Sequence, residues 1–157
     1  MPDTSPVTDR DVFVTRAFDA PVATVWKFWT QPALIAQWFG PDGFDVPLET
    51  VVIELEVGGR WQLTMREVSS GALYPITGTV TQVVPNEYLE IAADASTDSG
   101  ELEDLGLRIT FHDHGEKTRV TLHQGEFTDE QKKETAVGWE MSWVALDGLL
   151  SAEGATK

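Results

Sequence analysis

Tryptophan is the residue type of this sequence with the clearest capacity for binding chemistry, because the chain has six of them among 157 residues. Flat, rigid indole rings can bind an apolar or planar ligand by contact area, without polar groups in a special geometry. The alternative is that these rings only fill the core. Trp26 and Trp29 lie three residues apart and Trp139 and Trp143 four apart, so each pair can share one face of a helix.

A metal site is the second chemistry to consider. His112 and His114 would share one face of an extended strand, and Asp113 or Glu116 could add a carboxylate ligand. However, the segment has the composition of a hairpin turn, where exposed His and Asp are ordinary, and its spacing matches no zinc motif. We therefore predict no metal site and no cofactor.

Acid–base residues are numerous, but the sequence does not orient them. Glu54 and Glu56 alternate with apolar strand residues, so they should face solvent. If their face of the sheet is instead the concave one, either carboxylate could point into the pocket, have a raised pKa and act as a base. Arg66, Arg108 and Arg119 also lie between apolar neighbours and could bind a carboxylate of a ligand. No Gly-x-Ser-x-Gly motif is present, so no catalytic residue is assigned and enzymatic activity stays open.

The composition excludes several classes of function. A net charge of −15, from 26 acidic and 11 basic residues, repels nucleic acid and anionic membranes, so neither is an expected partner. No segment is long and apolar enough to span a bilayer, and the N-terminus has no signal-peptide pattern. The absence of cysteine excludes disulfides and thiolate sites, and it favours a cytoplasmic location.

The first elements that must position these residues are a strand and two helices. Alternation over residues 12–17 predicts the strand. Apolar residues at i, i+3, i+4 and i+7 then predict a helix over about 21–29, and Pro32 begins a shorter helix that contains Leu34, Ile35 and Trp38.

The rest of the chain reads as strands and one long helix. Strands are predicted over 51–57, 61–65, 76–84, from 88 onward, over 107–111 and around 120–122, with Gly58-Gly59 as a tight turn and the acidic segment 94–104 as a mobile loop. The last helix carries an apolar stripe made of Trp139, Trp143, Leu146 and Leu150, with Val137, Met141 and Leu149 beside them. Because strands and helices do not alternate, the sheet should be antiparallel, with seven strands, and the fold class α+β.

Several short motifs occur in an order and spacing typical of a known family. They are Phe18-Asp19-Ala20-Pro21, Gln37-Trp38-Phe39-Gly40-Pro41, Val57-Gly58-Gly59-Arg60-Trp61, Val84-Pro85-Asn86-Glu87-Tyr88-Leu89 and Gly138-Trp139. With them, residues 10–150 resemble the START-like, or SRPBCC, superfamily, which includes birch-pollen-allergen-like proteins and polyketide cyclases. The most similar branch is named for the C-terminal domain of the activator of the heat-shock-protein-90 ATPase.

The resemblance implies a helix-grip fold, in which a curved antiparallel sheet wraps around the long C-terminal helix and two short helices connect strands 1 and 2. It implies one domain over residues 11–152, between a flexible tail of residues 1–10 and a C-terminal tail of residues 153–157. It also implies a cavity between the long helix and the sheet. The expected ligand-binding residues are Trp26, Trp38, Phe39, Trp61, Leu63, Met65, Trp139, Ser142, Trp143 and Leu146.

Three functions follow from this resemblance. The first is binding of a small hydrophobic or aromatic molecule, for transport, sequestration or sensing. The second is a cyclase or dehydratase that uses the same cavity. The third is a protein-interaction module that works through the acidic surface and is related to chaperone ATPase activators, although no sequence feature supports a chaperone as its partner. A homodimer is compatible with all three.

Overall fold

The computed structural model describes residues 11–40, 43–97, 100–125 and 129–155, and within these ranges the strands outnumber the helices. The predicted tail over residues 1–10 lies outside the described part. The elements, in chain order, are β1 (Val12–Phe18), α1 (Val22–Thr30), α2 (Pro32–Ile35), β2 (Phe44–Asp45), the 3-10 helix η1 (Leu48–Thr50), β3 (Val52–Ile53), β4 (Trp61–Glu67), β5 (Leu73–Val84), β6 (Tyr88–Thr97), β7 (Gly100–His114), β8 (Lys117–Gly125) and α3 (Asp129–Ala155).

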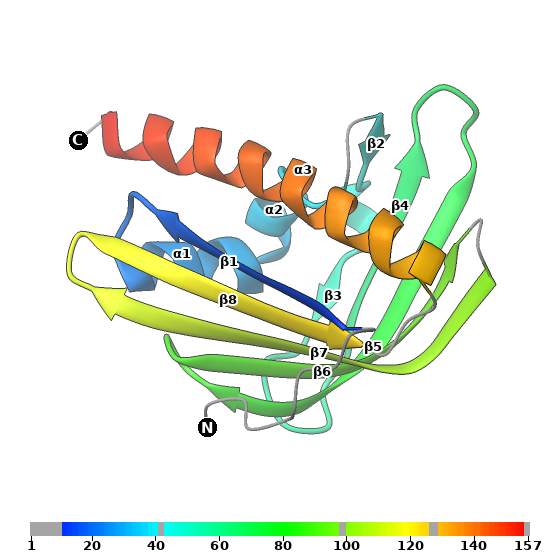
Figure 1. The fold of residues 1–157 in the computed structure, drawn as a ribbon, viewed down its shortest axis with the longest axis horizontal. Helices are drawn as coiled ribbons and strands as arrows, with labels where there is room; N and C mark the ends of the chain where they lie inside the picture. Colours follow the sequence, from blue (N-terminus) through cyan, green and yellow to red (C-terminus); the bar gives the residue numbers. More distant parts are fainter. Residues whose placement is uncertain (1–10, 41–42, 98–99, 126–128, 156–157) are drawn as a thin grey trace.

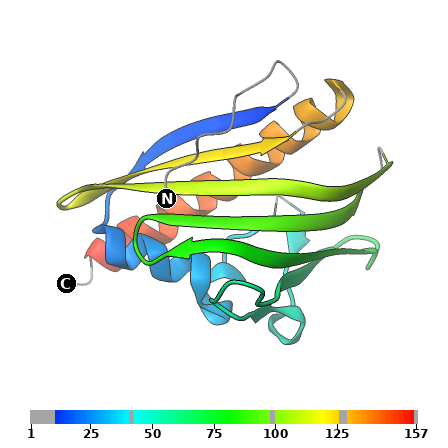
Figure 2. The same ribbon diagram turned by 90° about the horizontal axis from the view of Figure 1, so that it is seen from below.

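The strands form a curved antiparallel sheet with the order β1-β8-β7-β6-β5-β4-β2, and β3 pairs with β4 beside this path. The first strand therefore pairs with the last, with Val12 opposite Gln124 and Phe18 opposite Thr118. Figures 1 and 2 show α3 lying along one side of this sheet, with α1 and α2 between β1 and β2 in the chain. The α+β helix-grip fold predicted from the sequence is confirmed, with seven strands on the main path.

The predicted strand over 51–57 is much shorter, because the chain turns back after Ile53. The Glu54 carboxylate accepts hydrogen bonds from the backbone N–H and the Nε of Arg60, which closes the turn. Gly58 has a φ of 87°, and a Cβ on Gly59 would overlap the carbonyl oxygen of Glu54. Both positions of the turn therefore favour glycine. The tight turn predicted at Gly58-Gly59 is part of a longer loop that runs from Glu54 to Arg60.

The acidic segment 94–104 is not the predicted loop. β6 continues to Thr97 and β7 starts at Gly100, with Ala95 opposite Leu102 and Thr97 opposite Gly100. Backbone hydrogen bonds extend the hairpin through a composition that is typical of loops, because strand formation depends more on context than on the residue types themselves. Residues 98–99 lie outside the described part.

Helix α3 contacts the interior with a narrower stripe than the sequence predicts. Trp139, Trp143, Leu146 and Leu150 are buried at spacings of three and four residues, as expected. In contrast, Val137 is 53% exposed and Met141 38% exposed, because they lie on the flank of the helix that faces away from the sheet. Among the described residues, no helix is apolar over a length that would cross a bilayer.

We expect Gly138→Ala to stabilise the protein by about 0.5–1 kcal/mol, because alanine is a better helix former and a Cβ at this position would meet nothing within 4 Å. Thermal or urea unfolding measures the change. Gly59→Ala is the matched control and should destabilise, because its Cβ would overlap the Glu54 backbone. A loss of stability in Gly138→Ala would show that α3 packs more closely at this point.

Candidate functional site

The interior between the sheet and the helices contains a continuous group of aromatic rings, which we call the aromatic cluster. Its members come from α1, the segment after α2, the sheet and α3, and each ring lies within 6.5 Å of another, centroid to centroid. They are Phe18, Trp26, Trp29, Trp38, Phe39, Trp61, Phe111, Trp139 and Trp143.

Trp29 is at the centre of the aromatic cluster. Its side chain is fully buried, and its ring lies 4.8 Å from that of Trp38 and 5.8 Å from that of Trp139, with which it stacks. It also meets Trp143 and Phe111 edge to face, at 6.4 Å and 6.2 Å. One residue of α1 therefore joins the sheet, the loop after α2 and the C-terminal helix.

Phe39 links the aromatic cluster to strand β4. Its ring is 5.9 Å from that of Trp61 on β4 and 5.4 Å from that of Trp139 on α3. The rings thus form a path from β4 to α3 that does not depend on Trp29.

Of the ten residues expected to bind a ligand, the structure buries all but one. Trp26, Trp38, Phe39, Trp61, Leu63, Trp139, Ser142, Trp143 and Leu146 are buried, and Met65 is half-buried against the core. The six aromatic residues of this set belong to the aromatic cluster, whereas Leu63, Met65 and Leu146 pack in the surrounding core. Their role in lining a cavity stays a prediction.

Three members of the aromatic cluster are not among the ten expected ligand-binding residues: Phe18, Trp29 and Phe111. Trp29 had a usable signal, because it lies three residues after Trp26 on the same helical stripe. Phe18 and Phe111 each lie at the end of a strand pattern in which apolar residues alternate. The sequence does not show which face of those strands points inward, because that depends on how the strands pair.

The hydroxyl of Ser142 connects α3 to the segment after α2. Its Oγ donates to the carbonyl of Gly138 at 2.9 Å and accepts from the backbone N–H of Gly40 at 3.1 Å. The hydroxyl hydrogen is thus already used within the protein.

The indole N–H groups of the aromatic cluster differ in how they are satisfied. Trp38 donates to the carbonyl of Phe28 and Trp139 to Oε1 of Gln124, each at 2.9 Å. The buried Nε1 atoms of Trp29, Trp61 and Trp143 have no acceptor among the described residues. A buried donor without a partner costs about 1–3 kcal/mol, and most buried polar groups in proteins are paired.

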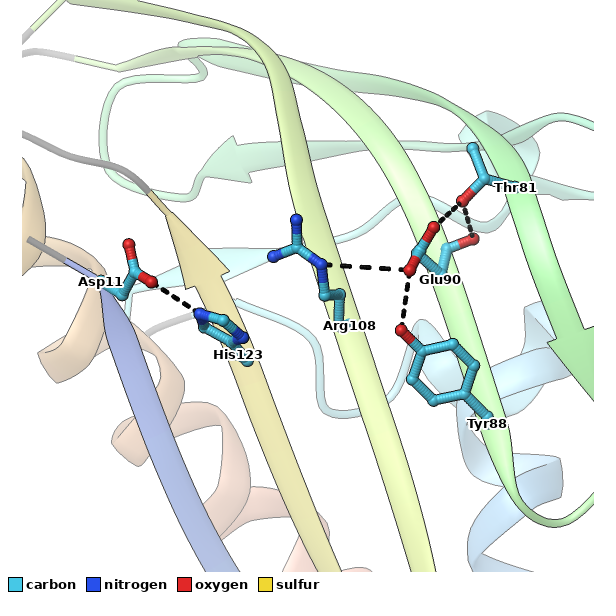
Figure 3. Close-up of polar contacts among 6 residues, drawn as sticks. All are labelled: Asp11, Thr81, Tyr88, Glu90, Arg108 and His123. Carbon is cyan, nitrogen blue, oxygen red and sulfur yellow. Dashed lines mark hydrogen bonds and ion pairs between the residues drawn. The ribbon is translucent and has the colours of Figure 1, made fainter. Parts of the chain in front are cut away.

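A group of polar side chains lies on the face of the sheet opposite the aromatic cluster (Figure 3). We call it the polar row, and its members are Asp11, Thr81, Tyr88, Glu90, Arg108 and His123. Gln124 contacts Trp139 on α3, so the neighbouring His123 points to the opposite face, because side chains alternate along a strand. There His123 Nε2 lies 2.6 Å from Oδ2 of Asp11, and both side chains are at least 95% buried. Cβ atoms on Gly106 and Gly125, which pair across β7 and β8, would overlap Arg108 and Asp11, respectively.

The polar row continues across β7, β6 and β5 through Glu90. Its carboxylate accepts hydrogen bonds from the Tyr88 hydroxyl and the Thr81 hydroxyl, both at 2.7 Å. Nε of Arg108 lies 3.9 Å from the same carboxylate. Arg108 therefore faces away from the aromatic cluster and forms a cross-strand ion pair. A His–Asp pair can act as a general base, but this one lies on the face opposite the aromatic rings.

The other candidate acid–base residues lie in solvent. Glu54 and Glu56 are exposed, and hydrogen bonds from Arg60 hold the pKa of Glu54 below its usual value, the opposite of the shift that a base in an apolar pocket would have. Arg119 is exposed, and Arg66 forms a two-point ion pair with Asp45 at 2.9 and 2.6 Å.

The two histidines of the β7–β8 hairpin, His112 and His114, differ in their surroundings. Burial lowers the pKa of His112, and the charges of Arg119 and His114 add to this effect. His114 is exposed beside the turn. Within the described ranges, no three His, Asp or Glu side chains are grouped so that they could hold a metal ion.

Comparison with known proteins places this geometry in a family. The family model for Activator of Hsp90 ATPase homolog 1-like protein matches residues 19–151. Similar solved structures include the AHSA1 protein from Silicibacter pomeroyi, with 23% identity, a TM-score of 0.79 and coverage of 91% of this chain and 99% of that one. Proteins from Rhodobacter sphaeroides (21% identity, TM-score 0.78, 94% and 97% covered) and Chromobacterium violaceum (20%, 0.77, 89% and 96%) share the fold as well. No curated protein matches the chain.

Proposed function

Because the chain belongs to the family of Activator of Hsp90 ATPase homolog 1-like proteins, we propose that it binds a small apolar or aromatic molecule among the rings beneath α3. The aromatic cluster is the observation that carries this proposal. It gathers rings from separate elements into one apolar interior, where a planar molecule can gain contact area on several sides. The protein would act in the cytoplasm as a carrier, a sequestering protein or a sensor.

Catalysis has weaker support than binding. The buried polar and charged residues of the described part are Asp11, Thr118, His123 and Ser142. Asp11 and His123 face away from the aromatic cluster, and the hydroxyls of Thr118 and Ser142 donate to backbone carbonyls. A cyclase or dehydratase needs groups that exchange protons with the substrate, and none of these is in place to do so.

A protein partner is the second candidate, favoured by one surface feature of α3. Val137, Met141 and Val144 recur at spacings of four and three residues and are exposed, which makes a short apolar stripe. Sedimentation of the purified protein over a range of concentrations tests self-association through this stripe. A dimer that Val144→Asp dissociates would support it, and a monomer at all concentrations would exclude the homodimer.

Native mass spectrometry of the protein purified from its own host tests the proposed function. We expect a fraction of the protein to carry a small additional mass that is lost on denaturation. Trp139→Ala should reduce that fraction and weaken naphthalene binding about tenfold, because it removes a ring that joins both ends of the aromatic cluster.

Leu73→Ala is the control for this test, because Leu73 is 61% exposed on β5. Binding should be measured at a temperature at which all variants are folded. If neither a bound mass nor naphthalene binding is found, the proposed function is wrong.

A further inference from the structure

Three buried indole donors in the aromatic cluster have no acceptor among the described residues, and they come from different elements. Trp29 is on α1, Trp61 on β4 and Trp143 on α3. The rings of Trp29 and Trp143 lie 6.4 Å apart, and that of Trp61 is joined to them through Phe39 and Trp139. Unpaired indole donors are therefore present at the centre of the aromatic cluster, beside α3, and at its β4 side.

The polar side-chain groups of Trp38, Trp139 and Ser142 in the same interior are already matched within the protein. Trp38 and Trp139 donate to Phe28 and Gln124, and Ser142 bonds to Gly138 and Gly40. The buried side-chain atoms that lack a partner in the described ranges are all donors, so a molecule that enters the aromatic cluster can satisfy them by supplying acceptors.

The same interior offers no counter-ion for an anionic ligand. Among the described residues, the buried polar and charged side chains include no lysine or arginine, and His123 is paired with Asp11 on the other face of the sheet. A buried carboxylate without a cation costs far more to desolvate than a neutral carbonyl. The donors therefore suit an uncharged acceptor.

We infer that the ligand of the aromatic cluster is an uncharged apolar or aromatic molecule with a carbonyl-type oxygen, which accepts a hydrogen bond from the indole N–H of Trp29, Trp61 or Trp143. This inference rests on the proposed function and adds the chemical class of the ligand. These three tryptophans would then bind the ligand in two ways, through ring contact and through a hydrogen bond from an indole N–H.

A matched pair of probes tests the inference. 2-Acetylnaphthalene carries a carbonyl, and 2-isopropenylnaphthalene has nearly the same shape with a CH2 group in place of the oxygen. Calorimetric titration of the full chain should show that the ketone binds about tenfold more tightly, as expected for one hydrogen bond of ordinary strength. The anion 2-naphthoate should bind more weakly than the ketone.

NMR of the indole N–H groups in the unaltered protein provides a second readout. The ketone, but not the hydrocarbon, should move the signal of Trp29, Trp61 or Trp143 downfield. The signals of Trp38 and Trp139, whose N–H groups are bonded within the protein, serve as internal controls and should respond alike to both probes. The variants Trp61→Phe and Trp143→Phe assign the indole signals, because each lacks one of them. The variant that lacks the indole to which the ketone is hydrogen-bonded should bind the ketone no more tightly than the hydrocarbon.

The outcomes separate the two proposals. Equal affinity for both probes with no ketone-specific shift would leave the proposed function in place and overturn the inference about the acceptor. Tighter binding of 2-naphthoate than of the ketone would overturn the uncharged character of the ligand. If neither naphthalene probe binds, the inference fails, and if native mass spectrometry shows no bound mass either, the proposed function itself fails.

Discussion

Trp29→Ala is expected to lower the free energy of unfolding by about 3–5 kcal/mol, the range measured when large buried aromatic side chains are removed. Trp29 is fully buried and meets Trp38, Phe111, Trp139 and Trp143. Its loss would leave a cavity where the sheet and the helices meet, and the surrounding rings are too rigid to close it fully. Urea unfolding followed by circular dichroism measures the change.

Two further variants separate the causes of this loss. Trp29→Phe keeps a ring and should recover more than half of the stability, although its smaller volume leaves part of the cavity. Leu73→Ala, at an exposed site, should change stability by no more than about 0.5 kcal/mol. If Trp29→Ala cost no more than the control, the aromatic cluster would not be the structural centre of the fold.

Asp11→Ala is expected to cost about 1–3 kcal/mol, because it removes the carboxylate to which the buried His123 ring is hydrogen-bonded. The Asp11–His123 contact joins the start of β1 to β8, the strand with which β1 pairs. Loss of the carboxylate should therefore loosen the edge of the sheet. Hydrogen exchange of the β1 amides, compared with those of β6, locates the effect.

A double-mutant cycle isolates the pair. His123→Ala and the double variant Asp11→Ala/His123→Ala complete it, and the double variant should cost clearly less than the sum of the single variants. Additivity within about 0.5 kcal/mol would show that the two side chains act independently. Affinity for 2-acetylnaphthalene should be unchanged in the folded variants, because the pair lies on the face of the sheet opposite the aromatic cluster.

Periodic patterns predict the α+β class and the antiparallel sheet, and the resemblance to the START-like superfamily adds the helix-grip arrangement. Alternation in β1 and β4 and helical spacing of Trp139, Trp143 and Leu146 each identify an element and its buried face. The failures come from interactions that periodicity does not contain. Glu54 folds back onto Arg60 and shortens β3, while strand pairing carries β6 and β7 through an acidic stretch that resembles a loop.

The candidate site was predictable as a set of residue types but not as a set of neighbours. The aromatic residues were identified from their number and position, whereas the central position of Trp29 depends on how α1, β7 and α3 meet. The hydrogen-bond state of each indole depends on single atoms, such as Oε1 of Gln124 opposite Trp139. Likewise, only the pairing of β8 with β1 shows that His123 faces Asp11 and not the aromatic rings.

A crystal structure of the protein with 2-acetylnaphthalene tests the binding of an apolar ligand beneath α3 most directly. We expect electron density for the probe between α3 and the sheet, in contact with rings of the aromatic cluster and with its carbonyl oxygen within hydrogen-bond distance of Nε1 of Trp29, Trp61 or Trp143. Density for the probe only on the outer face of the sheet or along the exposed stripe of α3, with the rings packed as they are here, would contradict the proposal.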